Sequence, residues 1–215
     1  MLRTALLLSA LAGCAAAPTA EPLLATVPLG SAQVLVVRAS GGVPFVAILT
    51  AYERAGAAWA RVGSAMPATL GRTGIIPGEQ KREGDGHTPA GLHGIGLAFG
   101  YEKSLATGLA YRQATDDDYW VDEPSSPSYN RWVKGKPSVS AERMRRDDGA
   151  YEVGAVLEWN TELPVPGRGS AIFLHVWGGR DEPTAGCVAM SEADVRRVLA
   201  WLDRRRQPVI LIAKG

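Results

Sequence analysis

Residues 169–190 have the sequence GSAIFLHVWGGRDEPTAGCVAM, and this stretch carries the two side chains on which the interpretation of the chain depends. The apolar run Ala171–Leu174 predicts a strand that ends at His175. The loop that follows can return the chain, so that Cys187, in a turn, faces the histidine. We therefore predict that a thiol and an imidazole meet at the end of a strand.

A cysteine beside a histidine is typical of nucleophilic catalysis. A free thiol, with a pKa of about 8.5, is only partly ionised at neutral pH, so it needs a base, and imidazole is the natural one. Gly186 lets the backbone approach closely, and adjacent amide N–H groups could form an oxyanion hole. Each side chain also has a structural interpretation: His175 as a hydrogen-bonded core imidazole and Cys187 as a small buried apolar residue.

A helix is predicted directly after this turn. Ser191 can cap it, with Asp194 three residues further on. Its apolar stripe consists of Val195, Val198, Leu199 and Leu202. A thiol near a helix N-terminus feels a partial positive charge, so we expect the helix to favour the thiolate of Cys187.

The rest of the chain has a strand-like pattern. Apolar or alternating runs, separated by Gly and Pro, predict strands near residues 34–37, 45–49, 59–62, 151–159 and 208–212. The polar segment 103–150 predicts a long, partly irregular insertion that acts as a lid or shapes a substrate site. Together these patterns predict one mainly β domain over residues 31–215, with one helix near its C-terminus.

The first fourteen residues, MLRTALLLSALAGC, have the marks of an export signal. Their apolar run is too short to span a bilayer. Leu11–Cys14 resembles the bacterial lipoprotein box, which predicts a signal peptide over residues 1–13, a lipid on Cys14 and an Ala- and Pro-rich tether over residues 14–30. Ala15 implies sorting to the outer membrane, with the protein on its periplasmic face and held by lipid alone. An ordinary cleaved signal is the alternative.

Composition excludes several classes of protein. The chain has 23 Lys and Arg against 22 Asp and Glu, and this balance argues against a nucleic-acid partner. Two cysteines allow neither a disulfide framework nor a four-cysteine zinc site. His87 and His93 could join the Cys–His pair around zinc, but their spacing matches no recognised site, so no metal is expected. A lone thiol in an exported protein suggests a chemical role for Cys187.

The order His…Thr-x-Gly-Cys resembles the L,D-transpeptidase family, whose YkuD-type catalytic domain remodels bacterial peptidoglycan. Supporting segments are Lys81–Gly91, Ala98–Tyr101 and Trp120–Val133, beside Gly169–Trp177 and Pro183–Met190. The resemblance extends from about Gln33 to the C-terminus. It implies a YkuD-like β-sandwich or barrel with one C-terminal helix and a long insertion.

The resemblance also implies a reaction without metal or organic cofactor. Cys187 would attack the carbonyl of the third residue of a peptidoglycan stem peptide and expel the terminal D-alanine. His175 would deprotonate the thiol, the backbone carbonyl of Val176 would orient the imidazole, and the backbone at Gly186 would contribute to the oxyanion hole. The acyl group would pass to an amine, on a second stem peptide or a wall-attached protein.

The residues leave several features of the site open. The candidate residues for substrate binding are Thr184, Trp177, Trp120, Tyr129 and Asn130. For the last three, a packed loop around a buried Trp is an equal alternative. Family members often have an arginine at the position of Ala189, so the identity of the acceptor is undetermined. A hydrolase of the same fold (an L,D-carboxypeptidase or wall-protein amidase) and a non-catalytic wall-binding lipoprotein remain alternatives.

Overall fold

The computed structural model describes residues 22–215. The predicted signal peptide, Cys14 and the predicted tether as far as residue 21 lie outside the described residues. Within residues 22–215 the chain is mainly β, with a single α-helix. None of the helices in that range has the length and apolar character needed to cross a membrane.

The strands follow one another in chain order as β1 (Gln33–Ala39), β2 (Val46–Ala55), β3 (Ala58–Thr69), β4 (Ile75–Ile76), β5 (Thr88–Pro89), β6 (Gly91–Gly100), β7 (Ala110–Gln113), β8 (Asp118–Val121), β9 (Arg131–Lys134), β10 (Ala141–Arg143), β11 (Val153–Leu157), β12 (Phe173–Val176), β13 (Val188–Met190) and β14 (Val209–Ala213). The helix α1 spans Glu192–Trp201. Short 3-10 helices cover Pro22–Thr26, Gly78–Gln80 and Arg204–Arg206.

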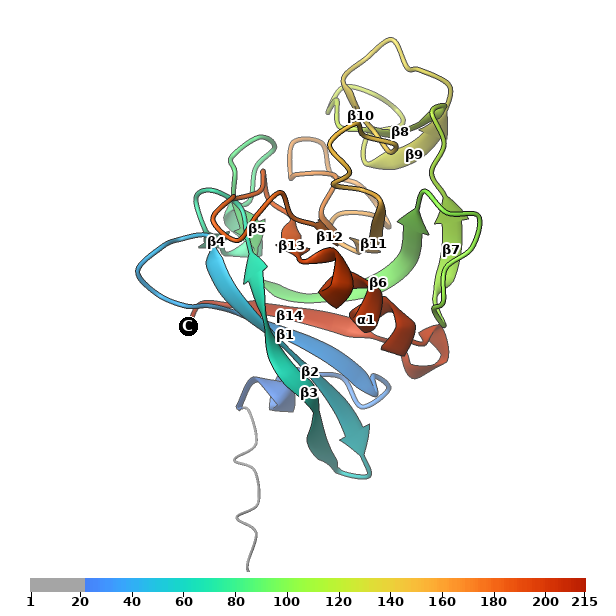
Figure 1. Cartoon of the computed structure of the whole chain (residues 1–215). Coiled ribbons are helices and arrows are strands. Elements are labelled where there is room, and N and C mark those ends of the chain that lie inside the picture. The colour runs from blue at the N-terminus through green and yellow to red at the C-terminus, as the bar shows by residue number, and fades with distance from the viewer. Residues whose placement is uncertain (1–21) are drawn as a thin grey trace, which may run out of the picture.

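The main sheet closes on itself. Its nine strands have the order β11-β12-β13-β3-β2-β1-β14-β6-β7, and β11 also pairs with β6. Neighbours such as β1 and β2 are antiparallel, whereas β1–β14 and β12–β13 are parallel. A closed sheet leaves few unpaired strand edges. The predicted fold class, a mainly β barrel with one C-terminal helix, is thus confirmed (Figure 1).

The core lies inside the barrel and beneath α1. Large side chains from several strands, among them Leu35, Leu49, Leu174 and Ile210, are fully buried there. The predicted helix is confirmed with its cap, since the Asp194 N–H donates to Ser191 Oγ at 3.2 Å. Its apolar stripe packs against β11 and β12. The helix therefore supports from behind the two strands that lead to the Cys–His segment.

The insertion is more regular than its sequence predicts. Residues 103–150 contain β7 and a second, three-stranded sheet of order β10-β8-β9. In Figure 1 this small sheet stands at the end of the barrel where β11, β12 and β13 are labelled. Its strands are three or four residues long, which is too short for a clear alternation of apolar and polar residues.

A buried carboxylate holds the small sheet together. Asp118, which is fully buried, accepts hydrogen bonds from the Thr115 N–H and hydroxyl and from the Trp132 indole. It also pairs with Arg112 at 3.0 Å and Lys134 at 3.1 Å. Burial by itself would raise the pKa of Asp118, but the hydrogen bonds from Thr115, Trp132 and Lys134 outweigh it and hold the pKa well below its usual range.

Replacing Asp118 with asparagine should therefore destabilise the protein by about 2–3 kcal/mol at pH 7, because charged hydrogen bonds are lost. A carboxylate whose pKa is lowered on folding contributes stability above its unfolded pKa of about 3.9, and this contribution is lost as the pH falls. Urea unfolding should show the difference from wild type shrinking below about pH 4. The exposed neighbour Asp117 gives the control. If Asp117→Asn lowers the free energy of unfolding by as much, the buried hydrogen bonds of Asp118 are not the cause.

The packed domain begins earlier than predicted. Residues 22–30 fall within the expected tether, yet Leu24 and Val27 are buried against valines and a leucine of β1 and β14. The apolar side chains of this short segment cover the outer face of two barrel strands, and burying them favours docking over a free linker. The segment around Leu24 and Val27 therefore packs with the domain, although it lies before Ser31.

Candidate active site

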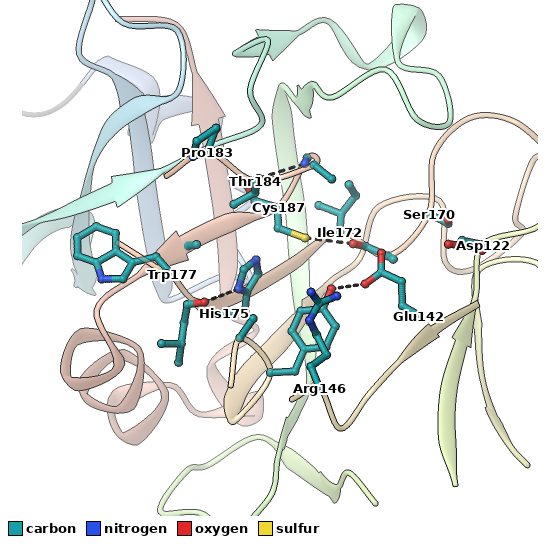
Figure 2. Close-up of a pocket in the computed structure, with 18 of the residues that line it drawn as sticks. Asp122, Glu142, Arg146, Ser170, Ile172, His175, Trp177, Pro183, Thr184 and Cys187 are labelled. Atoms are coloured by element: carbon teal, nitrogen blue, oxygen red, sulfur yellow. Dashed lines mark hydrogen bonds between the residues drawn. The ribbon is translucent and has the colours of Figure 1, made fainter. Parts of the chain in front are cut away.

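A cavity of about 460 Å³ lies beside β12 and β13. Both predicted catalytic residues, Cys187 and His175, line it. Four other candidates from the sequence line it as well, namely Val176, Trp177, Thr184 and Gly186. Figure 2 shows the imidazole and the sulfur facing the same space.

Strand register explains why these two side chains share the cavity. In the parallel pair β12–β13, Leu174 lies opposite Val188 and His175 opposite Ala189. Cys187, one residue before β13, is therefore level with Phe173. Side chains alternate between the two faces of a sheet, so His175 and Cys187 project from the same face of neighbouring strands. The loop between the strands brings together residues that are twelve positions apart in the sequence.

The imidazole of His175 is oriented by the backbone. Its Nδ1 lies 2.8 Å from the carbonyl oxygen of Val176, as the resemblance implied. A carbonyl only accepts, so we assign the hydrogen to Nδ1, which leaves the lone pair of Nε2 available as a base. The ring of Tyr151 packs edge-on at 5.4 Å. Burial lowers the pKa of His175 to about 4, so the ring is neutral at pH 7.

The sulfur of Cys187 is held between two backbone groups. Sγ accepts a hydrogen bond from the Phe173 N–H at 3.3 Å and donates one to the Ala171 carbonyl at 3.2 Å. The residue is only 6 % exposed and forms no disulfide. Burial raises the pKa of the Cys187 thiol to about 12.

The expectation that a helix N-terminus stabilises the thiolate is therefore wrong. Strand β13 separates Cys187 from α1, which begins at Glu192. The field of a helix end falls off within about one turn, so the loss of solvation dominates. With a thiol pKa of about 12 and an imidazole pKa of about 4, the resting pair is neutral thiol and neutral imidazole. Proton transfer has to accompany attack on a substrate.

Thr184 shapes the turn before the cysteine. Its Oγ1 accepts from the Gly186 N–H at 3.1 Å and donates to the Cys187 carbonyl at 2.8 Å. The Gly186 N–H is thus already engaged, which argues against its predicted part in an oxyanion hole. In residues 22–215 no acceptor pairs with the Cys187 N–H, which makes this group the better candidate donor.

The position of Gly186 tolerates no side chain. Its φ is +156°, and a Cβ there would lie 2.9 Å from the carbonyl oxygen of His87. Gly186→Ala should displace the turn and lower the rate of acyl-enzyme formation by about 10²-fold, since small misplacements of a reacting group have effects of that size. A Cβ at Gly179, in the same loop, would lie 3.6 Å from the nearest atom of Glu182, so Gly179→Ala is the control. Mass spectrometry measures the rate of acyl-enzyme formation. Equal rates for Gly186→Ala and Gly179→Ala would contradict this prediction.

Three of the candidate substrate residues lie behind the cavity wall and not on it. Trp120, Tyr129 and Asn130 are all buried. The Trp120 indole donates to Asn130 Oδ1 at 2.8 Å, and the Tyr129 hydroxyl donates to Glu83. Their expected contact with substrate is replaced by a supporting role, because the small sheet turns them inward. Trp177, which is half-buried, lines the cavity as expected.

Charged residues that the sequence did not single out form the opposite wall. Glu142 and Arg146, from the insertion, face the cavity together with Glu83 (Figure 2 labels the first two). The Tyr151 hydroxyl donates to Glu142, and the Arg146 guanidinium lies 5.2 Å from the centre of the Tyr151 ring. Burial raises the pKa of Glu142. The run of charged residues at 142–148 is visible in the sequence, but the sequence does not show that its side chains face a cavity.

No metal site is formed by the described residues, among which no three His, Cys, Asp or Glu side chains are grouped to hold an ion. His93 lies in β6, and its Nε2 is 3.2 Å from the carbonyl oxygen of Pro89. The arrangement of His87, His93, His175 and Cys187 therefore does not support the zinc alternative. The chemistry of the cavity rests on its thiol, its imidazole and the charges around them.

Comparison with known proteins points to one family. The family model YkuD, the L,D-transpeptidase catalytic domain, matches residues 48–211. Two crystal structures of the helical cell shape determining protein Pgp2 from Campylobacter jejuni, one of them of a point mutant, match at 11% identity and a TM-score of 0.45. They cover 86% of this chain, which spans about half of theirs (48% and 47%). Comparison with curated proteins gives no match.

Proposed function

Because the chain belongs to the L,D-transpeptidase (YkuD) family, we propose that it is a cysteine acyltransferase that acts on the stem peptides of peptidoglycan. Cys187 is the nucleophile and His175 is the base. The main support is that both side chains line one cavity. Nδ1 of the imidazole is hydrogen-bonded to the Val176 carbonyl, which leaves Nε2 available. That arrangement fits covalent catalysis by a thiol.

The proposed reaction has two steps. In the first, Sγ of Cys187 bonds to the carbonyl carbon of the stem peptide as its proton passes to Nε2 of His175. The C–N bond then breaks, and the proton leaves on the amine of the terminal D-amino acid. In the second step, an acceptor amine attacks the thioester and loses a proton to Nε2. The C–S bond breaks and the proton returns to sulfur. The Cys187 N–H, which has no acceptor among residues 22–215, would stabilise the tetrahedral intermediates.

The charge of the cavity supports an amine as acceptor. Glu83, Asp122 and Glu142 face it, whereas the two cations of its lining, Lys81 and Arg146, are paired with Asp85 and Asp148. Oδ1 of Asp122 is buried without a hydrogen-bond partner. Carboxylates of this kind attract an ammonium group and raise its local concentration.

Incubating the full chain with purified tetrapeptide muropeptides tests the proposal. Mass spectrometry should show loss of D-alanine together with joined stem peptides, and a covalent adduct on Cys187. Loss of D-alanine with addition of water alone would identify an L,D-carboxypeptidase and overturn the transferase assignment. Absence of both adduct and product would identify a non-catalytic wall-binding protein. Adding a lysine-bearing wall protein as acceptor tests whether a protein can accept the acyl group.

We also propose that Cys14 is lipidated and that the protein is anchored to the periplasmic face of the outer membrane. The motif that supports this is Leu11–Cys14, followed by Ala15. Expression in a Gram-negative host with a labelled fatty acid should label the wild type and not Cys14→Ala. Equal labelling of both would refute the proposal.

A further inference from the structure

We infer that Asn130 is a positioning residue of the active site: through the backbone of Ala171, its carboxamide sets the direction of the Cys187 thiol. The thiol donates its hydrogen bond to the Ala171 carbonyl, and Figure 2 marks this bond by the dashed line from the sulfur. The conformation of Ala171 therefore decides where the resting proton of the nucleophile points. The role in turnover rests on the proposed function, but the role in thiol orientation does not.

Ala171 has a backbone conformation that alanine rarely adopts. Its φ is +52°, in the left-handed region, which costs an L-residue roughly 1–2 kcal/mol. Such conformations persist only where the surrounding structure holds them, and they concentrate at functional sites. Ala171 is also buried and lines the catalytic cavity. If it relaxed to an extended conformation, its carbonyl would turn away from the sulfur.

Asn130 supplies the restraint. Its Oδ1 accepts from the Ala171 N–H at 3.1 Å. The same oxygen accepts from the Trp120 indole at 2.8 Å, so both of its lone pairs are used. Its Nδ2 donates to the carbonyls of Trp159 (3.1 Å) and Asn160 (2.6 Å). The carboxamide is therefore fully bonded, and its orientation is determined by four partners.

This chain of contacts links the insertion to the nucleophile. Asn130 directly precedes β9 of the small sheet, and Trp120 lies in β8. Neither residue lines the cavity. Behind the cavity wall, Oδ1 of Asn130 accepts a hydrogen bond from the Ala171 N–H, and inside the cavity the Ala171 carbonyl accepts one from Sγ of Cys187. The sulfur is then fixed between that carbonyl and the Phe173 N–H. Asn130 thus keeps the thiol aligned until a substrate arrives.

Other groups act on the same thiol. The carboxylate of Glu142 and the burial of the site raise the pKa of Cys187, while Lys81 and Arg146 lower it. His175 lines the cavity beside the sulfur, and Tyr151 lies against His175. A substitution at Asn130 removes none of these side chains. A change in the pH dependence of the thiol in such a variant therefore reports on the Ala171 contact.

The test compares Asn130→Ala, Ala171→Gly and the double variant. Iodoacetamide alkylation of Cys187 is followed from pH 6 to pH 10, and acyl transfer to muropeptides is measured in parallel. In Asn130→Ala the thiol loses its acceptor, so its pKa falls by about one unit and alkylation at pH 8 is about tenfold faster. Acyl transfer is about tenfold slower because the sulfur is misaligned. Ala171→Gly alone stays close to wild type.

The double variant Asn130→Ala, Ala171→Gly gives the decisive comparison. Glycine adopts φ near +52° without the cost that alanine bears, so it should recover most of the wild-type alkylation profile in the absence of Asn130. No recovery in a folded double variant would overturn the inference, as would an unchanged profile in Asn130→Ala. Val133→Ala, in the same small sheet, controls for general destabilisation and should leave the profile unchanged; a matching shift there would also refute the role.

A further variant covers the case in which Asn130→Ala does not fold. Ala171→Val keeps Asn130 but introduces a β-branched residue that strongly disfavours a positive φ. It should shift alkylation in the same direction, and a wild-type profile would contradict the inference. Because alkylation needs no turnover, altered profiles without any acyl transfer would sustain the thiol positioning and reject the proposed function alone.

Discussion

Replacing Cys187 with alanine should abolish the covalent adduct with a stem peptide and reduce turnover on the order of 10³-fold or more, as removal of a nucleophile does in other covalent enzymes. No other cysteine lies among residues 22–215, so no second thiol in that range can substitute. Intact-protein mass spectrometry after incubation with muropeptide measures the adduct directly. Turnover retained in the alanine variant would refute the assigned nucleophile.

The alanine variant should remain folded. The Cys187 side chain packs with the aromatic cluster around Phe99 and Phe173, and removing one sulfur from it should lower stability by only about 1–2 kcal/mol. Cys187→Ser is the matched control, because its hydroxyl keeps a polar atom between the Ala171 carbonyl and the Phe173 N–H. Both variants should unfold near the wild-type temperature and form no thioester.

Slow alkylation of the wild type is also expected, for a reason visible only in the structure. The thiol pKa of about 12 leaves little thiolate at pH 7, so iodoacetamide should react more slowly with Cys187 than with a peptide cysteine. Slow labelling therefore does not distinguish an inert module from an enzyme that transfers its proton only during attack. Adduct formation with a stem peptide does distinguish them.

Replacing His175 with asparagine should slow acyl-enzyme formation by about 10²–10⁴-fold, the range for loss of a general base. Asparagine can still donate to the Val176 carbonyl, which accepts from Nδ1 at 2.8 Å in the wild type, so this variant removes the base with little change in packing. Single-turnover kinetics with a muropeptide gives the rate. A rate within tenfold of wild type would exclude His175 as the base.

The pH dependence of the wild type follows from the same residue. Burial lowers the pKa of His175 to about 4, so the imidazole stays neutral as the pH falls to about 5. Below that, it takes a proton from solvent and cannot accept the thiol proton, so the rate should fall with an acid limb near pH 4. His175→Asn should lack this limb. A limb near pH 6.5 in the wild type would mean that the imidazole is solvated in the working enzyme.

Much of the fold could be predicted from local patterns. The strands around Val34–Val37 and Phe173–Val176, and the capped helix after Ser191, follow directly from runs of apolar residues and from capping chemistry. The small sheet of the insertion could not be predicted, since its strands are short and its central stabilising group is a buried carboxylate, Asp118. A polar residue that is buried by its partners has no signature in hydropathy.

The candidate site divides in the same way. Cys187 and His175 stood out because each sits in a Gly-rich or apolar context that suits catalysis, and the eleven intervening residues permit a return. Glu142 and Arg146 did not stand out as a wall, because a charged residue in a polar segment is usually a solvated one. Their direction depends on how the insertion folds over the barrel end, which is a matter of long-range contacts.

By itself, the order of the residues determined which atoms can react, because a thiol, an imidazole and a glycine turn are chemical identities that need no neighbours to be recognised. Only the tertiary structure decided the state in which those atoms rest. Solvent exclusion at Cys187 and His175, and the left-handed backbone of Ala171, arise from strands and an insertion that are remote in sequence. Protonation follows the local dielectric and hydrogen bonds, and both exist only once the chain has packed.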